Sequence, residues 1–413
     1  MRQTLIPRLA AHPLFLCGFR PFYVATAGYA VLLLAAWSAM LSGMLPMPDV
    51  PGGAVAWHAH ELIYGFALAA IAGFLLTAVP EFTGAPILDR HRLVLLSLLW
   101  LAGRAAYWLS GVLTVWPAAV LNLAFAVWLL ILFAPPIWRD PGRPQLSFVH
   151  ALLALAGAQA GVYFGHDPMA WLHLAMGVLM ILIVIALSRI SMRLINGMLD
   201  GEGVSEVDYL ARPPRRNLAM FAIGLYTAVE FLLPGNSVAG WLALAASAAV
   251  FNLLCDWHIG RHLFNRWIFM LYLVYWLMAL GYALIGLAVL ADWPLVSAGR
   301  HLLLAGAMGL AVFVVMAVAG RIHAGHWLDR RPWLPLAAGL IVVAAPLRVL
   351  AALPALAGMS NLLMAASALA WMAAFALFLA YFWRVLTGPR PDDAGGCAEP
   401  VRREDTPAGE FGC

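Results

Sequence analysis

Apolar stretches of about 20 residues recur along almost the whole chain. A membrane span needs roughly 20 mostly apolar residues, because ~30 Å of hydrocarbon is crossed at ~1.5 Å per residue and every backbone polar group must be paired inside the segment. The chain has 413 residues, of which 64% are hydrophobic and 11% charged, so its apolar surface exceeds what a water-soluble core of this size could enclose. The sequence therefore predicts an all-α, polytopic membrane helix bundle whose solvent is the lipid bilayer.

Twelve segments meet the length requirement. They are expected near residues 20–43, 56–80, 92–111, 113–135, 147–165, 168–192, 215–235, 238–256, 267–290, 298–320, 333–354 and 358–386. Residues 1–387 are expected to form a single transmembrane domain, and the Pro-, Gly- and charge-rich residues 388–413 a disordered cytoplasmic tail. No signal-peptide core precedes the first segment, which is therefore expected to be an uncleaved span.

The basic residues predict the orientation of the bundle. All 24 of them are Arg, and they are concentrated at the N-terminus, in alternate connections and in the tail, with no patch typical of nucleic-acid binding. Because basic residues stay on the cytoplasmic side, both termini are predicted to be cytoplasmic in a bacterial inner membrane. Three arginines break this rule, in the outer halves of the third, tenth and eleventh segments: Arg104, Arg300 and Arg348.

The four cysteines, Cys17, Cys255, Cys397 and Cys413, contain no C-x-x-C spacing. They are expected to be free thiols rather than a disulfide framework.

The twelve histidines fall into two groups under this topology. The outer group is His58, His60, His166, His173 and His301; the inner group is His12, His91, His150, His258, His262, His323 and His326. An imidazole within a membrane span is costly unless it finds a partner, and imidazole is a frequent ligand of haem and copper. The outer group therefore suggests a cofactor site.

The motif W-H-A-H-E, Trp57 to Glu61, opens the second segment. Residues two apart on a helix point about 200° apart, so His58 and His60 are expected to serve two directions. Glu61 is expected on the face of His58 and Tyr64 on the face of His60, each as a partner that fixes a tautomer. The alternative is an interfacial cap among lipid headgroups.

His173 and His301 begin the sixth and tenth segments and are the expected opposing ligands, with a bis-His haem between the second and tenth segments. Ala-Met-Gly followed by Arg-Ile at equal distance relates Ala175–Ile190 to Ala307–Ile322, which suggests an internal repeat.

The three exceptional arginines would then meet haem propionates. The alternatives are ion pairs with Glu61 or Glu230, or side chains that reach out to the interface. The latter is favoured for Arg300, and pairing is favoured for Arg104 and Arg348.

On the inner side, the spacings of His258 with His262 and of His323 with His326 place each pair on one helical face, where a metal such as copper could bind. Solvated loop histidines are the alternative, favoured for the first pair. His326 remains a candidate metal ligand.

Four blocks of the sequence resemble the NnrS family in order and spacing: PLFLCGFRPFY (13–23), WHAHELIYGFALAAIAGFLLTAVPEFTG (57–84), HLLLAGAMGLAVFVVMAVAGRIHAGH (301–326) and PRPDD. Proteins of that family are described as haem- and copper-containing polytopic membrane proteins of denitrification regulons and nitric oxide resistance. By position, the resemblance carries the family's histidines onto His58, His60, His301 and His326. The chain departs from the family at Gly325–Arg330, which reads G-H-W-L-D-R.

The layout is also similar to that of haem-copper oxidases and nitric oxide reductases, which have twelve spans and histidines on the second, sixth and tenth. The seventh segment here has Glu230 but no His, so a binuclear metal site is incomplete.

Three functions remain open. The first is a membrane haem protein, with copper, that binds nitric oxide or another small diatomic ligand in the response to nitrosative stress. The second is a nitric oxide or oxygen reductase-like enzyme using His58, His173 and Glu230. The third is a metal or haem transporter.

Overall fold

The computed structural model describes residues 5–201, 209–328, 330–392 and 397, and this part of the chain is all-α without strands. By their contacts these residues form two compact units. The first unit contains the residues up to Ala175, together with Val315–His326 and the described part of Phe378–Val401. The second unit contains Met176–Val314 and Trp327–Leu377. Most of the predicted tail, residues 388–413, lies outside the described residues.

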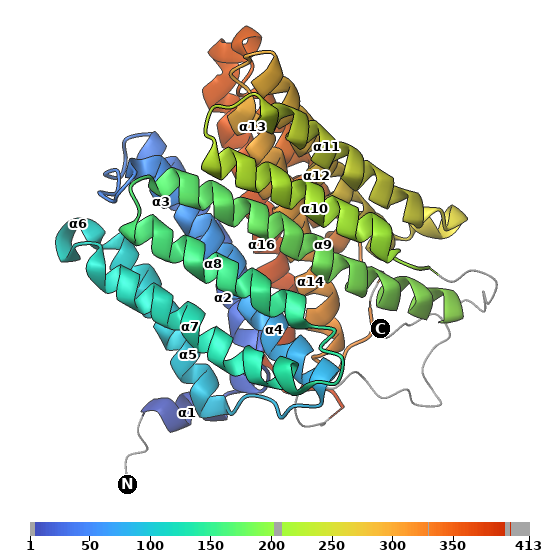
Figure 1. The fold of residues 1–413 in the computed structure, drawn as a ribbon. Helices are drawn as coiled ribbons and strands as arrows, with labels where there is room; N and C mark the ends of the chain where they lie inside the picture. The colour runs from blue at the N-terminus through green and yellow to red at the C-terminus, as the bar shows by residue number, and fades with distance from the viewer. Residues whose placement is uncertain (1–4, 202–208, 329, 393–396, 398–413) are drawn as a thin grey trace. The chain divides into compact units, whose positions relative to one another are not determined.

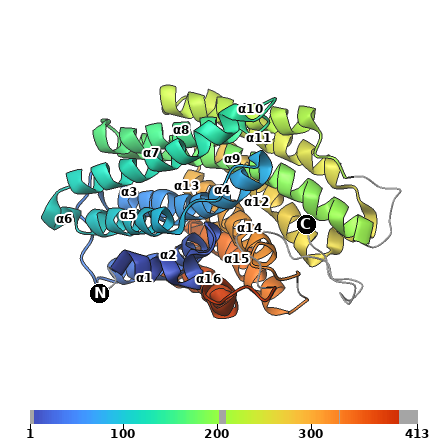
Figure 2. The ribbon, with the colours of Figure 1, turned by 90° about the horizontal axis from the view of Figure 1, so that it is seen from below.

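The first unit is built from the N-terminal helices (Figures 1 and 2). They are α1 (Leu5–Ala11), α2 (Phe19–Leu41), α3 (Gly53–His60), the π-helix η2 (Glu61–Ala67), α4 (Leu68–Thr83), α5 (Arg90–Trp108), α6 (Ser110–Leu113), α7 (Trp116–Arg139) and α8 (Leu146–Phe164), with the 3-10 turn η1 (Pro13–Phe15). Helix α2 packs on η2 and α4, α5 on α7, and α7 on α8. Helix α9 (Pro168–Gly201) continues from this unit into the second.

The second unit is also built of helices. Its helices are α10 (Pro213–Leu232), α11 (Val238–Leu254), α12 (Arg266–Leu290), α13 (Val296–His301), the π-helix η5 (Leu302–Met308), α14 (Gly309–Ile322), α15 (Trp333–Leu350) and α16 (Ser360–Thr387), with the 3-10 turns η3 (Cys255–Trp257), η4 (Gly260–Phe264) and η6 (Pro354–Met359). Helix α11 packs between α10 and α12, and α12 also packs on α13 and η5. The last residues of α14 and α16 belong to the first unit.

All twelve predicted segments form helices, and their ends agree within a few residues except for the sixth segment, predicted to end at 192, where α9 continues to Gly201. Ten helices of the described chain are long and apolar enough to cross a membrane. The other two predicted spans form α5 and α10, of 19 and 20 residues, which are long enough but carry several arginines. The protein is therefore a multi-pass membrane protein.

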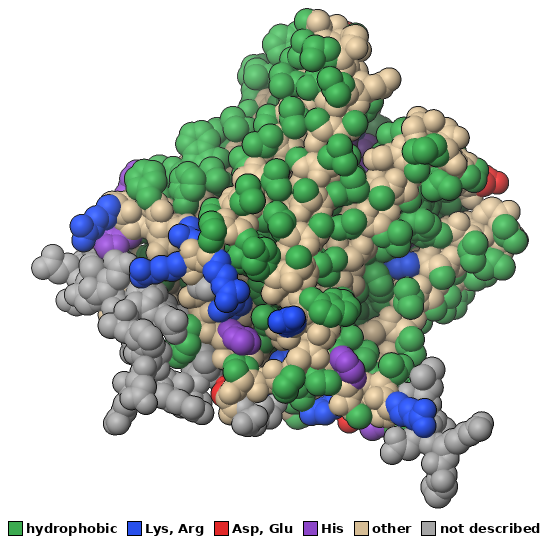
Figure 3. Space-filling model, turned by 180° about the vertical axis from the view of Figure 1, so that it is seen from behind, with side chains coloured by type: hydrophobic (Ala, Val, Ile, Leu, Met, Phe, Trp, Pro, Cys, Tyr) green, Lys and Arg blue, Asp and Glu red, His purple; other side chains and the backbone are tan. Residues whose placement is uncertain are grey.

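Large apolar side chains lie on the outside of the helices. Val112 is 82% exposed, Phe221 67% and Val120 67%. Hydrophobic side chains also cover most of the face seen in Figure 3. A surface of this kind is costly in water and favourable in lipid.

A disulfide joins Cys17 to Cys397 in the first unit, with 5.6 Å between their Cα atoms. The expectation of free thiols is therefore wrong for these two residues. The bond links positions 380 residues apart, which no local cysteine spacing could indicate. Cys255 is free and exposed, as predicted, and Cys413 lies outside the described residues.

Candidate functional site

The W-H-A-H-E motif lies where α3 changes into a π-helix. Helix α3 ends at His60, and Glu61 begins the seven-residue π-helix η2. Such segments are rare and often occur at functional sites. His58 and His60 point in two directions, as predicted: His58 stacks on Trp37 with ring centroids 4.4 Å apart, whereas His60 is fully buried.

Five side chains of the first unit form a closed set of hydrogen bonds, which we call the polar circuit: His60, Glu61, Arg104, Asn122 and Tyr163. His60 Nδ1 lies 3.0 Å from Glu61 Oε1, and His60 Nε2 lies 3.0 Å from the Tyr163 hydroxyl. Arg104 donates to Glu61 Oε1 and to Asn122 Oδ1, and Asn122 Nδ2 donates to the Tyr163 hydroxyl at 2.7 Å. The circuit joins four segments of the chain: α3 with η2, α5, α7 and α8.

The donors of the polar circuit assign the tautomer of His60. Arg104 can only donate, so Asn122 accepts through Oδ1 and is left to donate through Nδ2 to Tyr163. The Tyr163 hydroxyl therefore donates its own proton to His60 Nε2. The Nδ1–H of His60 in turn donates to the carboxylate of Glu61. Every bond of the circuit therefore has one donor and one acceptor, with a neutral His60. A buried network satisfied in this way holds its members in one arrangement.

Glu61 collects further donors at its second oxygen. Tyr29 donates to Oε2, and the indole N–H of Trp108 lies 3.0 Å from the same oxygen. Glu61 is fully buried and Arg104 is 4% exposed, so pairing stabilises both charges away from water. The predicted pairing of Arg104 is confirmed. The predicted position of Glu61 is wrong, because its carboxylate contacts His60 rather than His58.

Four members of this network were not singled out from the sequence: Tyr29, Trp108, Asn122 and Tyr163. One signal could have found Asn122, which is a buried amide in an otherwise apolar span. Tyr64, the expected partner of His60, does contact its ring at 5.0 Å between centroids, but its hydroxyl donates to the carbonyl of Leu155.

His301 of the second unit stands in the same local context as His60. It ends α13 and precedes the seven-residue π-helix η5, and Gly306 is the fifth residue of η5 as Gly65 is of η2. His301 Nδ1 lies 2.7 Å from the carbonyl oxygen of Ser297, so Nδ1 carries the proton and Nε2 the lone pair. Among the described residues Nε2 has no hydrogen-bond partner.

Close helix contact positions His301. A Cβ on Gly299 would lie 2.9 Å from the carbonyl oxygen of Gly281, so only glycine lets α13 approach α12 this closely. On the neighbouring α15, Arg348 lies within electrostatic reach of His301. The ion pair that the sequence analysis favoured for Arg348 is not found in the described part of the chain, where Arg348 has no acidic partner.

Arg300 forms an ion pair with Glu230 of α10, with 2.6 Å between Nη2 and Oε1. The expectation that Arg300 reaches out to the interface is therefore wrong. Its side chain is only 24% exposed, and the ion pair with Glu230 was the alternative that the sequence analysis did not favour for Arg300.

The remaining candidate histidines form no group of three with other potential metal ligands among the described residues. His173 lies half-buried in the first turns of α9. Helix α14 ends at Ile322, so the expectation that His323 and His326 share a helical face is wrong, and His258 also lies outside any helix, with His262 in the 3-10 turn η4.

Three arginines and one aspartate act electrostatically on His326 in the first unit. Burial lowers the pKa of His326, and Arg321, Arg20 and Arg390 lower it further, whereas Asp392 raises it.

A groove of about 500 Å³ opens between α2 and α5 in the first unit. Apolar side chains such as Leu32 and Leu101 line it, together with Tyr29, Arg104 and Trp108 of the Glu61 network. The groove therefore leads from the apolar exterior to the buried charges.

The described residues fit haem better than they fit copper. The free Nε2 of His301 is suited to bind iron, with Nδ1 fixed by a backbone carbonyl, as is usual for metal-bound histidines. His60 has the same tautomer, but its Nε2 already accepts from Tyr163. Within the described chain, no group of three His, Cys, Asp or Glu side chains could hold a metal ion.

Comparison with known proteins identifies the family. None of the curated proteins compared with the chain matches it. The family model described as NnrS protein matches residues 13–390 of the 413-residue chain, including the polar circuit, both π-helices and His301. The chain belongs to the NnrS family.

Proposed function

We propose that this protein is a bacterial inner-membrane haem protein that binds nitric oxide, and that His301 would hold the haem iron. Membership of the NnrS family supports a role in the nitric oxide response. The observation that carries the haem assignment is the half-buried His301, whose Nδ1 donates to the carbonyl of Ser297 and whose Nε2 has no hydrogen-bond partner within the described chain. Bound haem would supply an iron centre that accepts a diatomic ligand.

The residues around His301 would bind and orient the group. The carbonyl of Ser297 holds the imidazole in the tautomer that exposes the Nε2 lone pair. Arg348 is the cation best suited to a propionate, because Arg300 is already paired with Glu230 and Arg104 with Glu61.

We infer that the activity is binding without turnover. The alternative, a reductase-like site, would need further metal ligands beside the haem. Copper is proposed only as a second metal, and metal analysis of the purified protein would measure its content. The groove beside Arg104 gives a small apolar gas dissolved in lipid an approach to the first unit.

An optical spectrum with haem and metal analysis tests the proposal. The purified protein should show a Soret band that shifts with nitric oxide, and His301→Gly should lose most of the band and regain it with added imidazole. His166→Ala, which changes an outer histidine in a connection, is the matched control and should keep its haem. A protein without a Soret band, or a His301→Gly variant with full haem, would show the assignment to be wrong.

Nitric oxide consumption with an added electron donor separates binding from catalysis. We expect stoichiometric binding and no continuing consumption. Sustained consumption that depends on the donor would favour the reductase-like alternative.

A further inference from the structure

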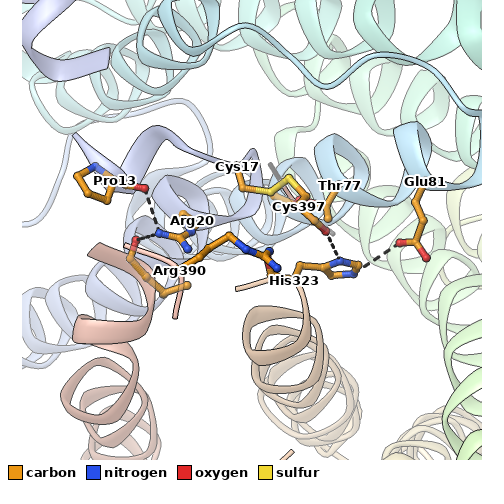
Figure 4. Close-up of a disulfide and its surroundings, with 10 residues drawn as sticks. Pro13, Cys17, Arg20, Thr77, Glu81, His323, Arg390 and Cys397 are labelled. Carbon is orange, nitrogen blue, oxygen red and sulfur yellow. Dashed lines mark hydrogen bonds and ion pairs between the residues drawn. A yellow bond between two sulfur atoms is a disulfide. The ribbon is translucent and has the colours of Figure 1, made fainter. Parts of the chain in front are cut away.

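The Cys17–Cys397 disulfide lies at the end of the first unit where the N-terminus meets the tail (Figure 4). Cys17 is 2% exposed and lies two residues before the start of α2, whereas Cys397 lies in the tail and is half-buried. The carbonyl of Cys397 accepts from His323 Nδ1 at 2.9 Å, and His323 Nε2 lies 3.6 Å from Glu81.

Hydrogen bonds hold the tail in place independently of the disulfide. Arg20 donates through Nη1 to the carbonyls of Pro13, at 3.1 Å, and Gly388, at 2.7 Å. Arg390 donates to the carbonyl of His323 at 2.7 Å and pairs with Asp392 at 2.6 Å. We expect these contacts to keep the two cysteines close in the reduced protein as well, which would raise their effective concentration.

The surroundings of Cys17 are cationic. The backbone N–H of Arg20 donates to the carbonyl of Cys17 at 3.2 Å, so the two residues are one helical turn apart, and Arg390 acts electrostatically on Arg20. Neighbouring positive charge favours the thiolate, which is the reactive form of cysteine.

The arginine pattern predicts that this end of the first unit faces the cytoplasm, where thiols are kept reduced and disulfides are mostly transient or redox-sensing. We propose that Cys17 and Cys397 form a reversible thiol–disulfide modification site, and that its oxidation locks residues 388–392 and Cys397 onto the inner ends of α2 and α14. This inference does not depend on haem.

The oxidant is a small disulfide of the glutathione class. The thiolate of Cys397, the more exposed of the two, attacks one sulfur and releases one glutathione thiolate, which leaves a mixed disulfide on Cys397. The thiolate of Cys17 then attacks the Cys397 sulfur and releases the second glutathione. Two protein thiols and one oxidised glutathione thus become one protein disulfide and two reduced glutathiones.

Thiol labelling at defined glutathione ratios tests the proposal. The full chain, with Cys255→Ser and Cys413→Ser, is equilibrated in membranes with mixtures of reduced and oxidised glutathione, quenched with acid, denatured and labelled with a maleimide that shifts its mass. We expect two labels in reduced glutathione and none in oxidised glutathione, reversibly. Two labels at every ratio, or none at any ratio, would overturn the proposal.

Intact and inverted membrane vesicles show on which side of the membrane the two cysteines are oxidised. Oxidised glutathione does not cross the membrane, so it should close the disulfide only in inverted vesicles. Closure in intact right-side-out vesicles would overturn the cytoplasmic site. The variants Cys17→Ser and Cys397→Ser serve as controls, because each should keep a single thiol that forms no intramolecular bond.

The role of the anchors is tested by Arg390→Gln, which changes a buried side chain of the tail that donates to the carbonyl of His323. Loss of a hydrogen bond from a charged group should lower the equilibrium constant for disulfide formation by about tenfold. An unchanged equilibrium constant would show that the contacts of Arg390 do not position Cys397.

Discussion

His60 and His301 each stand immediately before a seven-residue π-helix with glycine at its fifth position, in the first and the second unit respectively. In both, Nδ1 carries the proton, which it donates to Glu61 in one and to the carbonyl of Ser297 in the other. They differ at Nε2, which accepts from Tyr163 in His60 and has no hydrogen-bond partner among the described residues in His301. The same local structure therefore holds one imidazole with both ring nitrogens in hydrogen bonds, that of His60, and one with only Nδ1 in a described hydrogen bond, that of His301.

Replacing Arg104 with Ala should be strongly destabilising. The change leaves Glu61 as an unpaired, fully buried charge, which costs about 3–5 kcal/mol when one member of a buried pair is removed. Thermal unfolding in detergent measures the effect. The double variant Arg104→Met with Glu61→Gln should recover part of the loss, and equal stability of the single and double variants would show that the charge of Glu61 is not the cause.

Tyr163→Phe should leave Nε2 of His60 without its hydrogen-bond donor. The variant removes the donor to Nε2 and the acceptor for Asn122, at a cost of about 1–3 kcal/mol for the groups left without a partner. Haem content should not fall, because His301 is untouched. Tyr64→Phe, which loses only a bond to a backbone carbonyl, is the control and should cost less.

Gly65→Ala should disturb η2. The added Cβ would lie 2.5 Å from a ring carbon of Tyr29 and 3.2 Å from Arg104 Nη1, so the donors of Glu61 must move. A loss of about 1–3 kcal/mol is expected from such overpacking. Gly28→Ala, whose Cβ would meet nothing within 4 Å, should leave the unfolding temperature almost unchanged. Equal effects of the two variants would contradict the close contact at Gly65.

The stability of the inner end of the first unit should fall at acid pH. Burial, followed by Arg321, Arg20 and Arg390, lowers the pKa of His326 below that of the unfolded chain, while Asp392 raises it. The folded state thus binds a proton less readily, so the contribution of a neutral His326 is present above the unfolded pKa and is lost as the pH falls through the folded pKa. The unfolding temperature should therefore drop below about pH 6.5.

His326→Gln provides the control, because it removes the titrating group. The difference in unfolding temperature between the protein and this variant should depend on pH in that range. A difference that stays constant from neutral to acid pH would show that His326 does not titrate between the two states.

The sequence alone predicted the membrane-spanning segments and the all-α fold class. It could do so because a lipid solvent imposes a length and an apolar composition on every segment that crosses it. The same reasoning predicted the pairing of Arg104, because a buried arginine in a span needs a nearby carboxylate. Sequence alone also singled out His60 and His301.

The closure of the polar circuit was decided by packing, because Asn122 and Tyr163 come from α7 and α8 and meet His60 only when those helices assemble. The carboxylate of Glu61 turned to His60, and Arg300 met Glu230, for the same reason. Cys17 and Cys397, 380 residues apart, became partners because hydrogen bonds from Arg20 and Arg390 hold the tail at the end of the first unit. Periodicity and charge describe one segment at a time, whereas a hydrogen bond between segments depends on which helices are neighbours and at what register.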